Sequence, residues 1–196
     1  MIKWFQEGGM VMWILLIISL ISWCFIFERL FFIMSEYLSC KKMQLQLQDN
    51  LSATDECLSG NSQIAKVLRT ITNNQDLKKE ENSLILRTQL KEESVKLHSG
   101  LTFLEITASI SPLLGLLGTV LGMVEVFSVI AKVGVGDPLI LSSGISKALT
   151  TTVFGLIVAI PALTAFSLFE RKIENIIQIM EKFSVIILTR TYANKS

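Results

Sequence analysis

Residues 106–131 read ITASISPLLGLLGTVLGMVEVFSVIA, and this 26-residue run contains a single charged side chain, Glu125. The apolar core of a bilayer is about 30 Å thick, and a helix of about 20 residues crosses it. Inside a membrane every backbone N–H and C=O group needs a partner within the protein, which a helix provides. We therefore predict a transmembrane helix over this stretch.

Two further runs have the same character. No charged side chain occurs in residues 10–27 or in residues 148–169. None of the three runs alternates apolar with polar residues as barrel strands do. The first run lacks the small-residue cleavage pattern of a signal peptide and continues into Glu28 and Arg29, so we expect it to remain as a span. The sequence predicts an all-α membrane protein with three transmembrane helices, the second and third extended into a cytoplasmic helical domain.

The distribution of Lys and Arg predicts the orientation. Ten of them lie in residues 28–105 and five in residues 170–196, against one in residues 1–9 and two in residues 132–147. Cytoplasmic loops carry the excess of positive charge, so the N-terminus is expected outside. The predicted order is a periplasmic N-terminus (1–9), a first span (10–27), a cytoplasmic helical segment (28–105), a second span (106–131), a periplasmic loop (132–147), a third span (148–169) and a cytoplasmic C-terminal helix (170–196).

Helical periodicity continues outside the predicted spans. From about Ser83 onward an apolar stripe runs toward the second span, with charged residues opposite, and only Gly100 and Pro112 interrupt it. We expect one long helix there. The third span likewise continues past Glu170. The first stripe is Leu86, Leu90, Leu97, Leu101 and Leu104 opposite Lys91, Glu92, Glu93 and Lys96; the second is Ile173, Ile176, Ile177, Met180 and Phe183.

Small residues recur at steps of three and four in the second and third spans, whereas the first span is bulky, with Trp13 and Trp23 suited to lipid contact and membrane interfaces. Small faces let membrane helices approach closely, and plain helix packing is a sufficient explanation for the glycines. The small residues are Ala108, Ser111, Gly115, Gly118 and Gly122, in register with Glu125, in one span and Gly144, Ala148, Thr152, Gly155, Ala159 and Ala162 in the other.

Hydroxyl groups add a polar character to these two spans. Thr119 lies midway along the second span, and Thr150, Thr151 and Thr152 are consecutive in the third. Hydroxyls facing a lumen can bind water or a proton-carrying group. The alternative is a bond to the carbonyl four residues earlier in the same helix. Glu125 has two interpretations as well, a proton site or an interfacial acid that reaches Lys132.

The remaining residues do not predict enzymatic chemistry. The single histidine, His98, lies in the predicted cytoplasmic helix, and no phosphate loop, nucleophile–base pair or metal-binding pattern is recognisable. Cys24, Cys40 and Cys57 lack metal-ligand spacing and are expected to be free thiols. A net charge of +1 without a basic tail does not favour nucleic acid. We expect a protein that is not an enzyme and has no cofactor or metal.

Two motifs resemble the MotA/TolQ/ExbB proton channel family. They are SPLLGLLGTVLGM at residues 111–123 and GISKALTTTVFGLIVAIPA at residues 144–162. The opening Gly8-Gly9 and the Glu28-Arg29-Leu30 sequence are similar to the family too. Three spans and a short chain look closer to ExbB and TolQ than to the longer MotA-type stators, and closest to ExbB.

The resemblance implies a proton-channel subunit of a motor in the bacterial inner membrane that powers TonB-dependent transport. It implies a homopentamer around two copies of a single-span partner of the ExbD/TolR type, whose aspartate carries the proton, and a TonB- or TolA-like protein that receives the work. Thr119 and Thr152 map to residues that line the proton path. Apart from the resemblance, we expect Gly115, Gly118, Gly122, Gly155 and Pro161 to serve helix packing.

Alternatives within and outside the family remain. A TolQ-like role in envelope maintenance is the first, and a membrane scaffold without a channel is the second. A small secondary transporter would need broken helices or inverted repeats, which we do not recognise. Lys147 departs from the ExbB pattern, where glutamate is frequent. A lysine there would extend to the outer rim or pair with Glu125 at the same depth, and we favour these over a direct proton role.

Overall fold

The computed structural model describes residues 9–49, 65–67, 69–70, 78–134 and 138–193. Its long helices are α2 (Gly9–Asp49), α5 (Lys79–His98), α6 (Leu101–Val133) and α7 (Pro138–Ala193), and the described residues contain no strand. Three segments are long and apolar enough to cross a membrane: Met10–Lys41, Leu101–Lys132 and Ser142–Thr189. The predicted all-α class with three apolar helices is confirmed.

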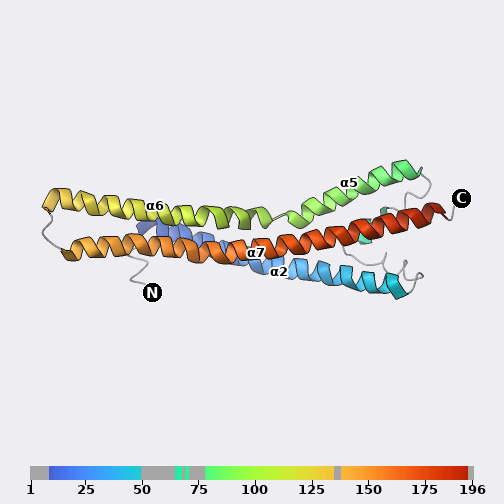
Figure 1. The fold of residues 1–196 in the computed structure, drawn as a ribbon, viewed down its shortest axis with the longest axis horizontal. Helices are drawn as coiled ribbons and strands as arrows, with labels where there is room; N and C mark the ends of the chain where they lie inside the picture. The colour runs from blue at the N-terminus through green and yellow to red at the C-terminus, as the bar shows by residue number, and fades with distance from the viewer. Residues whose placement is uncertain (1–8, 50–64, 68, 71–77, 135–137, 194–196) are drawn as a thin grey trace. The chain divides into compact units, whose positions relative to one another are not determined.

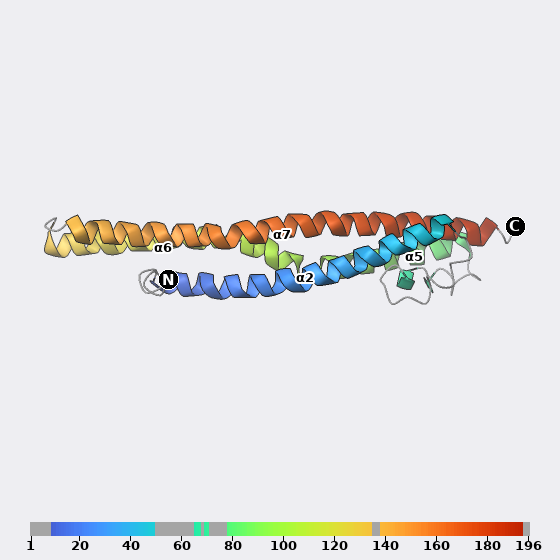
Figure 2. The same ribbon diagram turned by 90° about the horizontal axis from the view of Figure 1, so that it is seen from below.

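The first compact unit comprises Met1–Phe27 and Gly100–Ser167. Within it α6 and α7 lie side by side and antiparallel (Figures 1 and 2). The rings of Phe25 in α2 and Phe103 in α6 stack with their centroids 4.6 Å apart, which holds α2 against α6. Large side chains are buried in α2 and at the start of α6, where Met12, Leu15 and Leu104 are at most 1% exposed, and small ones in α7, where Ala148, Ala159 and Ala162 are buried.

The ends of the helices differ from the predicted segment bounds. Most of residues 132–147, expected as a loop, is helical, because α6 continues to Val133 and α7 already begins at Pro138. Proline is favourable in the first helical turn, where its missing N–H costs no bond. The predicted N-terminal segment lies outside the described residues except for Gly9, and the side of the membrane on which each end lies stays a prediction.

A break between α5 and α6 divides the long helix expected from Ser83 onward. Gly100 has φ 82° and ψ −18°, the left-handed conformation that glycine adopts without a steric penalty. The N–H of Ser99 donates to the Val95 carbonyl at 3.0 Å, which closes α5. The expectation of one continuous helix was therefore wrong at Gly100, whereas Pro112 lies inside α6 without ending it.

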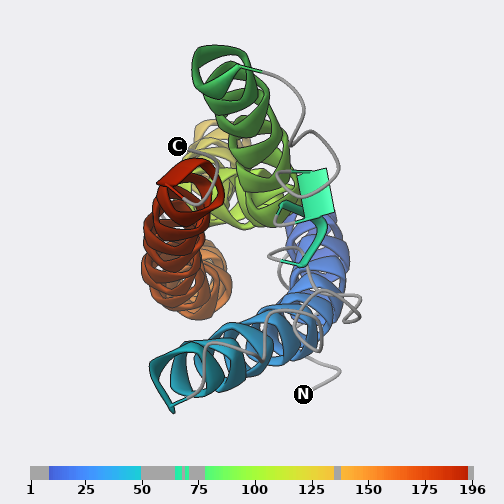
Figure 3. The same cartoon turned by 90° about the vertical axis from the view of Figure 1, so that its right-hand side faces the viewer.

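The second compact unit comprises Glu28–Ser99 and Leu168–Ser196. Here α7 lies between α5 and the later part of α2, as Figures 1 and 3 show. Asn82 Nδ2 of α5 donates to Tyr192 Oη of α7 at 3.1 Å, and the ammonium of Lys172 lies 4.5 Å from the ring centre of Tyr37 in α2. The predicted continuation of the third span is confirmed, because Ile173, Ile176, Met180 and Phe183 are buried.

Glu93 corrects the expected helix surface of α5. It was placed on the charged side, but its side chain is only 1% exposed, alongside buried Leu86 and Leu97. Glu93 fits the apolar stripe in register, since residues 86, 90, 93 and 97 are spaced by four, three and four. Because Glu93 is charged, the sequence predicted that its side chain faces solvent. Tertiary packing overrides that preference and buries it.

Candidate functional site

The backbones of α6 and α7 touch where glycine replaces larger side chains. A Cβ atom on Gly155 would lie 2.6 Å from the Ser111 carbonyl oxygen and 3.0 Å from the Gly115 Cα. A Cβ on Gly115 would lie 3.1 Å from both the Thr151 carbonyl oxygen and the Thr152 Cα. Because the obstructing atoms belong to the backbone, a larger residue at either position requires the helices to separate.

The same seam continues toward the end of α6. A Cβ on Gly118 would collide with the Thr151 methyl group, and one on Gly122 would lie 2.9 Å from the Ala148 Cβ. Gly144 of α7 faces Val126 in the same way. The structure thus brings together the four predicted packing glycines of the two spans. Pro161 lies inside α7, and its ring removes the N–H that would bond the Ile157 carbonyl.

Two of the three consecutive threonines bind carbonyls of their own helix. Thr150 Oγ1 donates to the Ser146 carbonyl at 2.8 Å, and Thr151 Oγ1 donates to the Lys147 carbonyl at 3.2 Å. Both are bonds to the residue four positions earlier, the simpler of the two alternatives. Thr151 is also 2% exposed, because its methyl group fills the space above Gly118.

The hydroxyls of Thr152 and Thr119, the two residues assigned to the proton path, both bind carbonyl groups within one turn of α6. Thr152 Oγ1 reaches across from α7 and donates to the Gly115 carbonyl at 3.2 Å. Thr119 Oγ1 donates to the Leu116 carbonyl at 2.6 Å. Both side chains are half-buried. The two hydroxyls thus bind the carbonyls of consecutive residues, and their role in proton movement stays a prediction.

Glu125 and Lys147 form an ion pair across the two helices. Lys147 Nζ lies 3.5 Å from Glu125 Oε2, and the side chains are 33% and 67% exposed respectively. The pair lines a crevice of about 160 Å³ together with Gly122, Val126, Val129, Ser143 and Gly144. The contact matches the pairing considered for Lys147, and Glu125 makes it with Lys147 rather than with Lys132. An exposed pair of this kind is weak.

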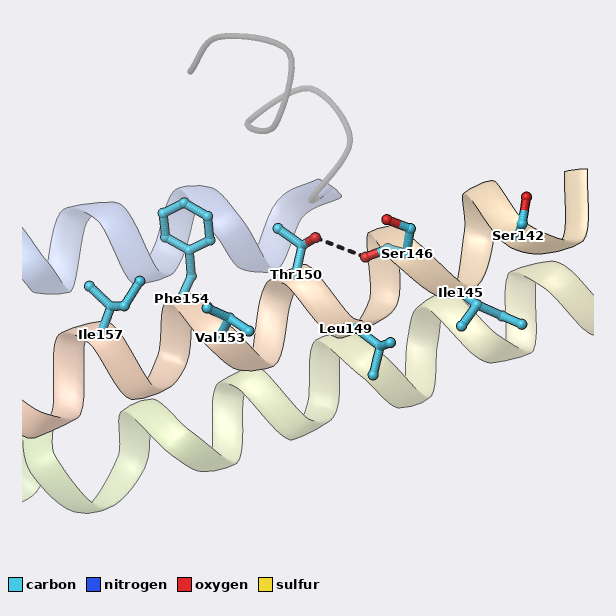
Figure 4. A pocket seen from close by; sticks show the side chains of 8 residues that line it. All are labelled: Ser142, Ile145, Ser146, Leu149, Thr150, Val153, Phe154 and Ile157. Carbon is cyan, nitrogen blue, oxygen red and sulfur yellow. Dashed lines mark hydrogen bonds between the residues drawn. The ribbon is translucent and has the colours of Figure 1, made fainter. Parts of the chain in front are cut away.

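A shallow groove runs along another face of α7 (Figure 4). Its volume is about 620 Å³, and the Thr150 hydroxyl at its side is occupied by the Ser146 carbonyl. A smaller crevice of about 210 Å³ between α2 and α7 shares Phe154 and Ile157 with it. An apolar face of this size on a membrane helix suits lipid or another helix. The lining residues are Ser142, Ile145, Ser146, Leu149, Thr150, Val153, Phe154 and Ile157.

The other residues considered in the sequence have local partners or no assigned role. His98 Nδ1 lies 2.8 Å from the Ser94 carbonyl, so this nitrogen carries the proton. Cys24 is an exposed free thiol and Cys40 a buried one, whereas Cys57 lies outside the described residues. Sequence reasoning missed Glu93, whose Oε1 accepts from Lys96 Nζ at 2.7 Å and from Gln89 Nε2 at 3.3 Å, while its Oε2 is buried without a hydrogen-bond partner.

Comparison with known proteins points to one family. The sequence model of the MotA/TolQ/ExbB proton channel family matches residues 59–182, which contain both motifs and all of α6. The biopolymer transport protein ExbB of Salmonella typhimurium is 29% identical over 173 residues, covering 81% of this chain and 71% of that protein. The match thus extends beyond the two apolar motifs.

Two shorter matches have higher identity. The biopolymer transport protein exbB1 of Vibrio cholerae is 45% identical over 80 residues, which cover 40% of this chain and 35% of that protein. The Tol-Pal system protein TolQ of Pseudomonas aeruginosa is 37% identical over 92 residues, which cover 47% of this chain and 40% of that protein. In these two alignments the chain spans little more than a third of each relative's length. Similarity thus extends to relatives of both ExbB and TolQ type.

Proposed function

Because the chain belongs to the MotA/TolQ/ExbB proton channel family, we propose that it is the channel subunit of an ExbB–ExbD-type motor of the bacterial inner membrane. In this proposal copies of the chain, five in number, surround a single-span partner of the ExbD/TolR type. The proton motive force then powers TonB-dependent transport across the outer membrane. The N-terminus lies in the periplasm, as the Lys and Arg distribution favours.

The proposal rests on one turn of α6 that has threonine hydroxyl groups beside it but no carboxylate. Two apolar helices are held in backbone contact at Gly115 and Gly155, where the Thr152 hydroxyl donates to the Gly115 carbonyl, and the Thr119 hydroxyl donates to the next carbonyl, that of Leu116. The only acid between residues 106 and 131 is Glu125, near the far end of α6, and residues 148–169 have none. A path with hydroxyls but no proton carrier at this depth needs a carboxyl group from a partner.

The energetics are sufficient for such a motor. One elementary charge that crosses a potential of 100 mV releases about 2.3 kcal/mol. A carboxyl group near the bilayer centre is costly when charged, so its protonation and its position are coupled. In this proposal the chain contributes the closely packed helices α6 and α7 and the hydroxyl groups of Thr119 and Thr152. No covalent catalysis is assigned to it.

The test is proton flux in liposomes. The chain alone and the chain with an ExbD-type single-span protein from the same genome are reconstituted, and dye quenching reports the decay of an imposed pH gradient. We expect faster decay only when both are present, and loss of the effect when the partner's intramembrane Asp is replaced by Asn. Equal flux through the chain alone would overturn the dependence on a partner.

A second candidate role is envelope maintenance with a TolR- and TolA-type partner set. The 37% identity to TolQ over 47% of the chain supports this role as a second candidate. Deletion of the gene distinguishes the two roles. Loss of uptake of a TonB-dependent substrate with an intact outer membrane supports the ExbB role, whereas detergent sensitivity with normal uptake supports the TolQ role. A scaffold without a channel predicts that Thr119→Val and Thr152→Val change neither phenotype.

A further inference from the structure

Glu105 carries a charge in an otherwise uncharged part of the first compact unit. Four of the described residues of that unit have charged side chains: Glu105, Glu125, Lys132 and Lys147. The last three lie near the end of α6 or in the first part of α7, where Glu125 and Lys147 form their ion pair. Glu105 lies at the opposite end of α6, four residues after Leu101, the first residue of that helix.

The packing of α7 on α6 places Glu105 beside an apolar part of α7. Gly155 contacts Ser111 across the seam, and the two helices are antiparallel (Figure 1). Six residues before Ser111 is Glu105, and six residues after Gly155 is Pro161, so these two lie at about the same level. The next charged residue of α7 is Glu170, nine residues or about 13 Å further along that helix.

The packing of α2 on α6 leads to the same conclusion. The ring of Phe25 stacks on that of Phe103, two residues before Glu105. Because α2 runs opposite to α6 (Figure 2), its residue level with Glu105 is about Trp23. The charges of α2 begin only at Glu28, five residues or about 7.5 Å later in that helix. Glu105 therefore lies within the apolar layer that both neighbouring helices define, although the sequence alone placed it at the end of the cytoplasmic segment.

Glu105 also lies on the side of α6 that is turned away from α2. Successive residues of a helix are 100° apart, so Glu105 is 200° around α6 from Phe103, which faces α2. Glu105 is exposed, whereas Leu104 and Ala108 beside it are buried. Thr119 follows 14 residues later, almost four full turns, and so lies on the same side of α6 as Glu105.

The carboxylate of Glu105 has no hydrogen bond or ion pair with any residue that the structure describes. Ser109 Oγ, one turn further on, donates to the backbone carbonyl of Glu105 at 3.0 Å instead. The only titratable side chain in the described part of α2 within this unit is Cys24, and α7 has none between Lys147 and Glu170. An ionisable group in an apolar layer is costly, and such groups typically serve ion or proton movement.

We propose that the Glu105 carboxylate is a proton acceptor at the inner end of the path, on the cytoplasmic side of the partner's carboxyl group. The inference rests on the proposed function, because the partner must first bring the proton into the membrane. Glu105 lies ten residues before Gly115, about 15 Å along α6, so it does not replace the partner's carboxyl group at that level.

The proton balance of the step is simple. The partner's carboxylic acid releases its proton to water and becomes a carboxylate. The resulting hydronium ion protonates the Glu105 carboxylate, which becomes a neutral acid. Cytoplasmic water then takes this proton and regenerates the carboxylate, so that one proton has moved inward and Glu105 is unchanged.

The first experiment uses the chain without its partner. A hydrophobic carbodiimide reacts with protonated carboxyl groups in apolar surroundings: the acid adds across a C=N bond, and the acyl group migrates to nitrogen as a stable N-acylurea. The full chain in liposomes is treated at several pH values, and mass spectrometry of its peptides locates the adduct. We expect labelling at Glu105 that increases toward acidic pH, and far less at Glu92, an exposed acid of α5.

The second experiment measures proton flux through the chain together with an ExbD-type single-span protein in liposomes. Glu105→Gln keeps the size of the side chain and removes its ability to take up a proton. We expect the flux to fall about a hundredfold, the lower end of the contribution of a positioned proton-transferring side chain. Glu105→Asp keeps the carboxyl group and should retain most of the flux. Glu92→Gln is the matched control, and co-purification of the partner reports assembly.

Each outcome decides the proposal. Loss of flux in Glu105→Gln, but not in Glu105→Asp or Glu92→Gln, together with labelling of Glu105, supports it. Unchanged flux in Glu105→Gln, or no labelling of Glu105 at any pH, overturns it and leaves the proposed channel function standing. If the unaltered chain and its partner conduct no protons, the proposed function and this inference fail together.

A further measurement covers variants that fail for structural reasons. If Glu105→Asp loses flux as fully as Glu105→Gln, or if either variant does not assemble, the carbodiimide reaction of the unaltered complex decides. Inhibition of flux that follows the labelling of Glu105 supports the proposal, and full flux through the labelled complex overturns it.

Discussion

The Gly155 backbone lies directly against the carbonyl oxygen of Ser111, so that a Cβ atom at Gly155 would approach that oxygen to 2.6 Å. The obstructing atom belongs to the backbone of α6 and does not have a rotamer by which to move away. The hydrogen bond from Thr152 to the Gly115 carbonyl lies within the same contact. The spacing of α6 and α7 and the position of the Thr152 hydroxyl therefore depend on the same glycine.

Replacing Gly155 by alanine tests this dependence. The added methyl group forces the helices apart, and we expect Gly155→Ala to lower the free energy of unfolding by about 1–3 kcal/mol, the usual cost of overpacking. Unfolding of the chain in mixed detergent micelles measures it. Leu163→Ala is a suitable control, because Leu163 is 55% exposed on the same helix. Equal stability of Gly155→Ala and the unaltered chain would contradict the close contact.

Gly100 allows a second test, of the break between α5 and α6. A left-handed residue other than glycine costs roughly 1–2 kcal/mol. Gly100→Ala should therefore destabilise the chain by about that amount or rejoin the two helices. Ser99→Ala is the control, because Ser99 has φ −52° and accepts alanine without backbone strain. Amide hydrogen exchange at residues 95–104 distinguishes the two results, since a rejoined helix would protect amides that the break exposes.

The sequence predicts the features of this fold that depend on composition and periodicity. Uncharged runs mark the three apolar helices, and steps of three and four place Gly115, Gly118, Gly122 and Gly155 on facing surfaces. Both signals are local, because each follows from one helix meeting an apolar environment or one close neighbour.

The features that were missed depend on which surfaces face each other. The Thr152 hydroxyl binds the Gly115 carbonyl 37 residues away, whereas Thr150 and Thr151 bind within their own helix, and nothing in the threonine run separates the three. Glu93 fits the α5 stripe by register, yet its charge argued for solvent. Gly100 was visible in the sequence, but a single glycine inside a helical pattern is often tolerated.

Glu93 provides a third prediction, on stability. Its side chain is 1% exposed, and one carboxylate oxygen is buried without a hydrogen-bond partner. Replacing a buried charge by an apolar side chain of similar size is often neutral or stabilising. We expect Glu93→Leu, which extends the stripe of Leu86 and Leu97, to leave the free energy of unfolding unchanged or raise it. The exposed neighbour gives the control Glu92→Leu. A clear loss of stability in Glu93→Leu alone would show that the buried carboxylate is itself required.

The partner of Glu93 gives a pH prediction. The hydrogen bond from Lys96 to Glu93, reinforced by the charge of that carboxylate, raises the pKa of Lys96 above its usual 10.5. A group whose pKa is higher in the folded state stabilises that state fully below its unfolded pKa, and the contribution is lost as the pH rises through the folded value. The stability difference between the unaltered chain and Lys96→Met should therefore be constant from neutral pH up to 10.5 and shrink above it. Lys91→Met, at an exposed position of the same helix, is the control. A difference that does not change on alkaline titration would contradict the coupling.

The last prediction concerns Glu125 and Lys147, whose charged atoms lie 3.5 Å apart. Because the two side chains are 67% and 33% exposed, solvent screens the pair, and we expect it to contribute at most about 1 kcal/mol. In the proposed ExbB-type role, Lys147→Gln should accordingly keep most TonB-dependent uptake, since it removes a weak bond and leaves Glu125 solvated. Lys147→Glu should be tolerated less well, because two acids would then face each other across α6 and α7. Glu125→Lys creates the equivalent repulsion between two ammonium groups, and the double variant restores an attractive pair with its polarity reversed.

Uptake measured in all four variants decides between a rim contact and a direct proton role. Rescue by the double variant supports the pairing, and a swap that rescues neither single variant refutes it. If Lys147→Gln alone abolishes uptake, the lysine takes part in proton transfer, because the lost contact is too weak to account for the effect.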